Sequence, residues 1–142
     1  MKNKIDLEIT VPNQTRYLSL IGKIGEDLAR VVDNFHGDRE ALAHHLNMVL
    51  TEAVVNAIKH ANAADPHKEV QIRISISDNE LFIRVFDQGR GFDLETVPPP
   101  PFTAAQVEEK GRGIFIIRSL MDSVEYKRAK GGNVLEMKKL LR

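Results

Sequence analysis

The chain has 142 residues, 42% hydrophobic and 28% charged, which is typical of a single globular domain. Its 20 Lys and Arg residues balance 20 Asp and Glu residues, so no net charge draws it to nucleic acid or to an anionic membrane. Cysteine is absent, the five histidines lack zinc-ligand spacing, and no apolar run resembles a membrane span or signal peptide. We therefore expect one cytoplasmic domain over residues 1–142.

The N-terminal segment predicts a strand and then a helix. In "IDLEITVP", over residues 5–12, apolar and polar residues alternate, which is typical of a half-buried strand. Over residues 13–35 the apolar residues recur at helical spacing, and Asn13 or Thr15 stands where a helix cap is expected. Two glycines inside this segment lower its intrinsic helix propensity.

A second helix and a hairpin follow along the chain. Gly37 breaks the first helical pattern, and Asp38 is placed to cap a helix over residues 39–61. Alternating residues then predict strands over residues 70–76 and 81–86, joined by a turn at "SDNE".

The last third begins with a long irregular region that contains four consecutive prolines, which exclude a helix there. After it we expect a helix over residues 114–122, a strand over residues 123–128, a turn at "KGGN" and a strand over residues 134–141. Hairpins mixed with helices predict an α+β fold, a two-layer sandwich with helices on one face of a mixed, mostly antiparallel sheet.

A first candidate site lies on the second helix. At 100° per residue, Glu52, Asn56 and Lys59 occupy the arc opposite the apolar face. Glu52 and Asn56 are one turn apart, and a carboxylate and an amide at that spacing could supply a proton acceptor and an oxygen ligand for Mg²⁺. The alternative is an ordinary solvated polar face.

A second candidate site is the segment "FDQGRGFD" at the end of a predicted strand. A buried Asp87 could accept a hydrogen bond from an amino group such as that of adenine, while Gly89 and Gly91 let a ligand approach the backbone. The alternative is a plain turn, since Asp and Gly are common turn formers.

A third candidate site opens the last helix. Gly111 and Gly113 leave backbone N–H groups accessible at a helix N-terminus, where the helix dipole favours an anion such as phosphate, and Arg112 strengthens that field. The alternative is a flexible joint ahead of an ordinary core helix.

Together, Glu-x-x-x-Asn on a helix, Asp-x-Gly-x-Gly after a strand and Gly-x-Gly before a helix resemble the GHKL ATPase superfamily, which has the Bergerat α/β sandwich fold. Four segments are more closely similar to the family of anti-sigma regulatory factors and serine/threonine protein kinases typified by RsbW and SpoIIAB. They are "LTEAVVNAIKHA", "VFDQGRGFD", "GRGIFIIRSLMDSVEY" and "GGNVLEMKK".

The resemblance implies a role for each matching residue. Glu52 would be the general base for a protein hydroxyl, Asn56 the Mg²⁺ ligand, and Asp87 the partner of the adenine amino group. The segment from about residue 94 to 110 would be the ATP lid. The other residues implied in nucleotide binding are Lys59, His60, Gly89, Gly91, Lys110, Gly111, Arg112, Gly113, Ile114 and Asn133. Asn133 stands where the family often has a threonine that contacts the nucleotide.

The implied function is that of an ATP- and Mg²⁺-dependent serine/threonine protein kinase in a partner-switching system. It would phosphorylate a STAS-domain antagonist and sequester a sigma factor or another target. An alternative is an ATP-binding module that sequesters a partner without kinase activity. A histidine kinase catalytic domain is disfavoured, because no helix with a phospho-acceptor histidine precedes the domain. Homodimerisation is common in the family, and the first strand and helix could supply its interface.

Overall fold

The computed structural model describes residues 4–33, 35–89 and 109–141. Five strands form one sheet: β1 (Ile5–Pro12), β2 (Glu69–Ser77), β3 (Glu80–Asp87), β4 (Ser123–Ala129) and β5 (Gly132–Leu140). The helices are α1 (Leu18–Val31), α2 (Arg39–Val55) and α3 (Glu109–Leu120), with a 3₁₀ turn η1 (Thr15–Tyr17) and a π-helical segment η2 (Asn56–Ala61).

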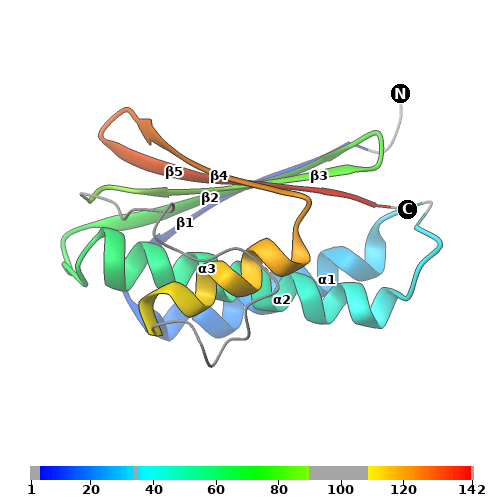
Figure 1. Ribbon diagram of the computed structural model, residues 1–142, viewed down its shortest axis with the longest axis horizontal. Coiled ribbons are helices and arrows are strands. Elements are labelled where there is room, and N and C mark those ends of the chain that lie inside the picture. Colours follow the sequence, from blue (N-terminus) through cyan, green and yellow to red (C-terminus); the bar gives the residue numbers. More distant parts are fainter. Residues whose placement is uncertain (1–3, 34, 90–108, 142) are drawn as a thin grey trace.

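The molecule is a two-layer sandwich in which the helices cover one face of the sheet (Figure 1). The strand order is β1-β2-β3-β5-β4, so the last strand in the chain lies between β3 and β4. The expected two-layer α+β fold is confirmed. The sheet differs in one respect from the expected mixed one, because every strand pair among the described residues is antiparallel.

The core lies between the sheet and the helices. Alternation along β2 and β3 turns every second side chain toward the helices, and Ile72, Ile74, Leu81 and Ile83 are at most 1% exposed. The predicted hairpin turn has positive φ at both central residues, Asp78 and Asn79, as expected for a two-residue type I′ turn. The sequence thus predicted these two strands and their connection correctly.

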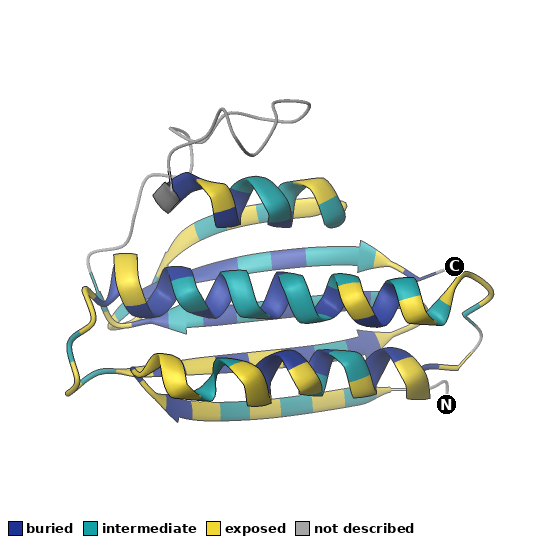
Figure 2. Ribbon diagram, turned by 90° about the horizontal axis from the view of Figure 1, so that it is seen from below, coloured by how far each residue is buried: buried dark blue, intermediate teal, exposed yellow. Residues whose placement is uncertain are grey.

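Helix α2 lies between α1 and α3 on the sheet (Figure 2). Its predicted cap is confirmed, because Asp38 Oδ1 accepts a hydrogen bond from the Ala41 N–H at 3.1 Å. The first helix is shorter than the predicted 13–35, and the Asn13 side chain does not cap it but donates to the Asp65 carbonyl at 2.9 Å. Among the described residues, no helix is both long enough and apolar enough to cross a membrane.

The solvent-facing side of the sheet carries paired charges. Glu136 on β5 lies 2.9 Å from Lys127 on β4 and 3.0 Å from Arg84 on β3. The hydrogen bond from Lys127 contributes most to holding the pKa of the Glu136 carboxyl below its usual value. These groups are partly exposed, so the pairs add little to stability and mainly keep this face hydrated.

The two glycines of α1 allow it to pack closely against α2. A Cβ on Gly25 would lie 2.8 Å from Leu50 Cδ1 and 3.0 Å from the backbone carbonyl of Leu46. A Cβ on Gly22 would meet only atoms of the Asn47 side chain. The glycines lower the helix propensity of α1, but they allow its backbone to lie close to α2. The helical spacing of the apolar residues alone does not predict this close contact.

This contact predicts different outcomes for two alanine substitutions in α1. Gly25→Ala should lower the free energy of unfolding by about 1–2 kcal/mol, because the strain against the α2 backbone exceeds the gain of about 1 kcal/mol in helix propensity. Gly22→Ala should lower the free energy of unfolding by less than Gly25→Ala, because it displaces the Asn47 side chain and not the α2 backbone, and the remaining cost is that of disturbing the hydrogen bonds of Asn47 with Glu26 and Thr51. Urea denaturation of both variants checks this, and a stabilised Gly25→Ala protein would contradict the packing argument.

Candidate functional site

Three of the segments that carry predicted site residues meet at one end of the molecule, on the left in Figure 1. These are the last turn of α2 with η2, the end of β3, and the first turns of α3. The start of β5 joins them, because Asp87 and Asn133 are direct partners in the β3–β5 register. The three candidate sites of the sequence therefore form one continuous region.

Glu52 and Asn56 converge on a glycine of α3. A Cβ on Gly113 would lie 2.6 Å from Glu52 Oε1 and 3.1 Å from Asn56 Nδ2. Asn56 is 3% exposed, which rules out the solvated-face interpretation for this residue. Its Nδ2 donates to the Glu52 backbone carbonyl at 3.0 Å, which turns Oδ1 the opposite way. The pair thus places a carboxylate oxygen of Glu52 and the amide nitrogen of Asn56 beside Gly113 of α3.

The structure corrects the predicted start of the last helix. We expected it to begin at residue 114, after the glycines, but α3 runs over Glu109–Leu120. Gly113 is therefore the fifth residue of the helix, beyond its first turn, and its N–H is not among the free groups at the N-terminus. Its lack of a side chain serves the contact with Glu52 and Asn56 instead. Gly111 remains in the first turn.

The end of the second helix is a π-helix and not the continued α-helix that we predicted. In η2 the Asn62 N–H donates to the Ala57 carbonyl, five residues back, at 2.8 Å. The 100° wheel placed Lys59 on one arc with Asn56, yet Lys59 and His60 are exposed while Asn56 is buried. π segments are rare in proteins and often occur at functional sites.

Asp87 forms the centre of a second cluster. It is 4% exposed, and its Oδ1 accepts hydrogen bonds from the Gly89 N–H and from Asn133 Nδ2, both at 3.0 Å. Its Oδ2 accepts from the Tyr126 hydroxyl at 2.7 Å. Asn133 Nδ2 also donates to the Gly89 carbonyl at 3.1 Å. The carboxylate is therefore held from β4, from β5 and from the segment after β3, which is more than a plain turn requires.

The segment after β3 is pressed against the end of η2. A Cβ on Gly89 would lie only 1.5 Å from the Ala61 carbonyl oxygen, so no other residue fits at this position without movement. Next to this contact, Asn62 is fully buried; its Oδ1 accepts from the Gln88 N–H at 2.7 Å and its Nδ2 donates to Asn13 Oδ1 at 3.0 Å. These bonds fix the two clusters relative to each other.

The remaining predicted residues have different surroundings. Gly111 is buried and Arg112 is exposed in the first turn of α3. Ile114 is fully buried in the core, so only its backbone could contact a nucleotide. Gly91, the Lys110 side chain and residues 94–108 of the expected lid lie outside the described residues.

Sequence reasoning missed Tyr126 and Asn62. Alternation along β4 places Tyr126 on the helix-facing side, which was a usable signal, but its contact with Asp87 depends on the order of the strands. Asn62 follows the helix with no pattern that marks it. Tyr126 bonds directly to Asp87, and Asn62 bonds to Gln88, which lies between Asp87 and Gly89.

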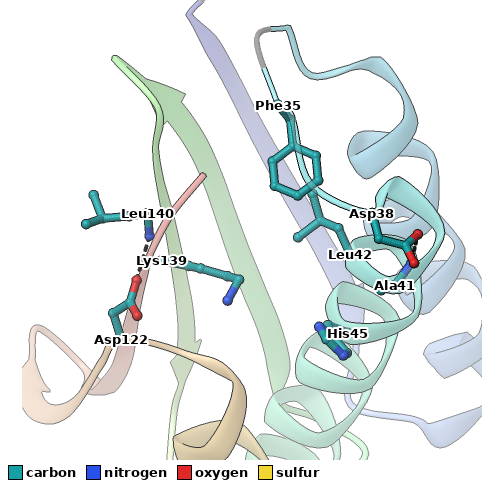
Figure 3. Close-up of a pocket in the computed structure, with 8 residues that line it drawn as sticks. All are labelled: Phe35, Asp38, Ala41, Leu42, His45, Asp122, Lys139 and Leu140. Atoms are coloured by element: carbon teal, nitrogen blue, oxygen red, sulfur yellow. Dashed lines mark hydrogen bonds between the residues drawn. The ribbon is translucent and has the colours of Figure 1, made fainter. Parts of the chain in front are cut away.

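A pocket of about 520 Å³ lies away from this site (Figure 3). It lies along the first half of α2, and the seven residues from His45, which lines it, to Glu52 correspond to about 10 Å of helix. Three of its polar side chains have partners within the chain: Asp38 accepts from the Ala41 N–H, Asp122 accepts from the Leu140 N–H, and Lys139 donates to the Leu120 carbonyl.

The described residues fit the expected nucleotide and metal. Among them, no cluster of three His, Cys, Asp or Glu side chains could bind a metal alone, so a cation here would depend on Asn56 and on ligand oxygens. Such a partial protein shell suits Mg²⁺, which usually keeps waters and binds substrate phosphates. The buried carboxylate of Asp87 suits an amino group of a base.

Residues 14–139 match the model of a protein family described as the histidine kinase-like ATPase domain. Since the match covers most of the chain, the chain belongs to this family. Within it, the chain is similar to the serine-protein kinase RsbW of Bacillus subtilis (strain 168), with 30% identity over 99% of this chain and 89% of the relative. RsbW of Listeria innocua is 31% identical, over 97% of this chain and 88% of the relative.

A solved structure supports the fold assignment. The blue-light activated histidine kinase of Erythrobacter litoralis EL346 matches 92% of this chain with a TM-score of 0.55 and 21% sequence identity. The matched part is 42% of that kinase chain, and the likeness concerns the fold alone.

The contact between Gly89 and Ala61 predicts a strong dependence on this glycine. Gly89→Ala should lower the free energy of unfolding by about 3 kcal/mol, because the added methyl group overlaps a backbone carbonyl that cannot rotate away. Gly131→Ala is the control: Gly131 has φ of +80° with no atom near its Cβ position, so only backbone strain of about 1 kcal/mol is expected. Equal losses in the two variants, measured by thermal and urea denaturation, would contradict the close approach.

Proposed function

We propose that this protein is an ATP-dependent serine/threonine protein kinase that acts as an anti-sigma factor in a partner-switching system. The observation that carries the proposal is the convergence of Glu52 and Asn56 on Gly113, beside the N-terminus of α3. The similarity to RsbW serine-protein kinases over nearly the whole chain supports it.

In this proposal Glu52 is the general base. Its carboxylate oxygen would accept the proton of a serine or threonine hydroxyl on the partner protein. The hydroxyl oxygen then forms a bond to the γ-phosphorus of ATP, the bond from that phosphorus to the β,γ-bridging oxygen breaks, and ADP leaves. Glu52 is only partly buried, so a partner hydroxyl can approach it from solvent.

The other site residues would hold the substrate. Asn56 would bind Mg²⁺ through Oδ1, and the cation neutralises charge on the phosphates. Asp87 would accept a hydrogen bond from the adenine amino group, and Gly111 and Arg112 in the first turn of α3 would bind phosphate oxygens. These positions extend along one end of the molecule, from the Asp87 cluster to the start of α3.

The proposed protein substrate is a STAS-domain antagonist, and the proposed sequestered partner is a sigma factor, both in the cytoplasm. A phosphate group adds about −1.5 to −2 charges at neutral pH, enough to change which partner binds an interface. The alternative is a module that binds ATP and sequesters a partner without phosphorylating it. Phosphoryl transfer separates the two.

Replacement of Glu52 tests the role of the base. Glu52→Gln keeps the shape of the side chain and removes the proton acceptor, so transfer of the γ-phosphate to a STAS protein should fall by about 10² to 10⁴-fold. ATP affinity should change by less than about three-fold, because the side chain is not proposed to bind the nucleotide. Radiolabel transfer and calorimetric titration with Mg²⁺ and ATP measure the two quantities.

Glu40→Gln serves as the control, because Glu40 lies on the first turn of the same helix and its side chain is 74% exposed. It should transfer phosphate at the unmodified rate. Unimpaired transfer by Glu52→Gln would overturn the proposed base. If ATP binds and no STAS protein from the same genome is labelled, the sequestering module becomes the better description.

A methyl group at Gly113 provides a separate test. The Cβ of Gly113→Ala would lie 2.6 Å from Glu52 Oε1, the mobile end of a side chain, so the variant should fold with a melting temperature close to that of the unmodified protein. The displaced carboxylate should lower transfer by about 100-fold, as expected for a base moved by about 1 Å. Normal transfer by a folded Gly113→Ala protein would show that the position of Glu52 does not matter.

A further inference from the structure

The carboxylate of Asp87 is held by more donors than a simple base-binding acid requires. Two of them, the Gly89 N–H and Asn133 Nδ2, bond to Oδ1, and one, the Tyr126 hydroxyl, bonds to Oδ2. Asn133 is 3% exposed and ties the same loop through the Gly89 carbonyl. The acid, the amide and the phenol therefore form one connected group.

The register of the sheet explains how the phenol reaches the acid. Asn133 pairs with Asp87 across β3 and β5, and Tyr126 pairs with Leu135 across β4 and β5. Leu135 is two residues from Asn133, so all these side chains lie on the helix-facing side. The Tyr126 side chain thus crosses over β5 to contact a residue two strands away.

The number of donors limits what a ligand can do here. An ionised carboxylate offers about four acceptor positions, two on each oxygen. Both positions on Oδ1 are used by Gly89 and Asn133, and one of the two on Oδ2 is used by Tyr126. Counting the donors among the described residues, the acceptor position left to a bound base is on Oδ2, beside the Tyr126 hydroxyl.

The geometry points to Tyr126 as a specificity-determining residue of the nucleotide site, which orients Oδ2 of Asp87 toward the 6-amino group of a purine. This inference rests on the proposed ATP-binding function and names a residue outside its list of binding residues. In a purine with a carbonyl at position 6, the carbonyl oxygen would face Oδ2 of Asp87; both atoms are hydrogen-bond acceptors, so this purine should bind less tightly. A purine with only hydrogen there makes no such bond.

The test compares three triphosphates by calorimetric titration with Mg²⁺: ATP, inosine triphosphate and purine ribonucleoside triphosphate, which has hydrogen at position 6. The unmodified protein should bind ATP at least about ten-fold more tightly than either of the others. Tyr126→Phe removes one hydroxyl and should weaken ATP binding about ten-fold, while binding of the purine analogue changes less than about two-fold.

Tyr17→Phe is the matched control, because Tyr17 is the other of the two tyrosines and lies in η1. It should leave all three affinities unchanged. A purely structural role for Tyr126 would weaken ATP and the purine analogue equally, and that result overturns the inference, as does unchanged ATP binding by Tyr126→Phe.

The comparison in the unmodified protein does not depend on how a variant folds. If that protein binds ATP and the purine analogue equally, the 6-amino group is not recognised and the inference fails, while the proposed kinase activity stands. If it binds no triphosphate at all, the proposed function fails as well. If the protein transfers label to a STAS protein and yet binds all three triphosphates equally, the inference about Tyr126 has failed while the proposed kinase function has not.

Discussion

The site depends on glycines at which the chain passes so close to another segment that an added Cβ would overlap it. Gly89 lies against the Ala61 carbonyl, and Gly113 lies against the side chains of Glu52 and Asn56. The first contact brings the end of β3 to the end of η2, and the second brings α3 to the last turn of α2. Without them the acid, the amide and the helix N-terminus would not share one region.

Hydrogen bonds among side chains and backbone groups further fix these segments relative to one another. The buried Asn62 connects the end of η2 to Asn13, which directly follows β1, and to the segment after β3. Asn133 connects that segment to β5. No buried side-chain nitrogen or oxygen in the described part of the chain lacks a partner. A polar network that is fully satisfied in this way holds its members in one arrangement, which a catalytic site requires.

Local patterns in the sequence predicted most of the fold, because strand alternation and helix caps act over a few residues. The same patterns failed where contacts between distant segments decide the structure. The π-helical segment has no periodic signal, so the helical wheel did not predict that Asn56 is buried while Lys59 is exposed. Glycine at position 113 resembled a helix boundary, although it lies inside α3 to make room for Glu52. The role of Tyr126 required the strand order, which no local pattern contains.

The position of β5 has a consequence for how the protein folds. This strand is the last one in the chain, yet it pairs with β3 on one side and β4 on the other. Its register joins Asp87 to Asn133 across 46 residues, and such long-range pairing is slow compared with local contacts. During synthesis, the helix pair and the β2–β3 hairpin can form first, whereas the Asp87 cluster must wait for the final strand. A chain that ends before β5 would leave two strand edges open to aggregation.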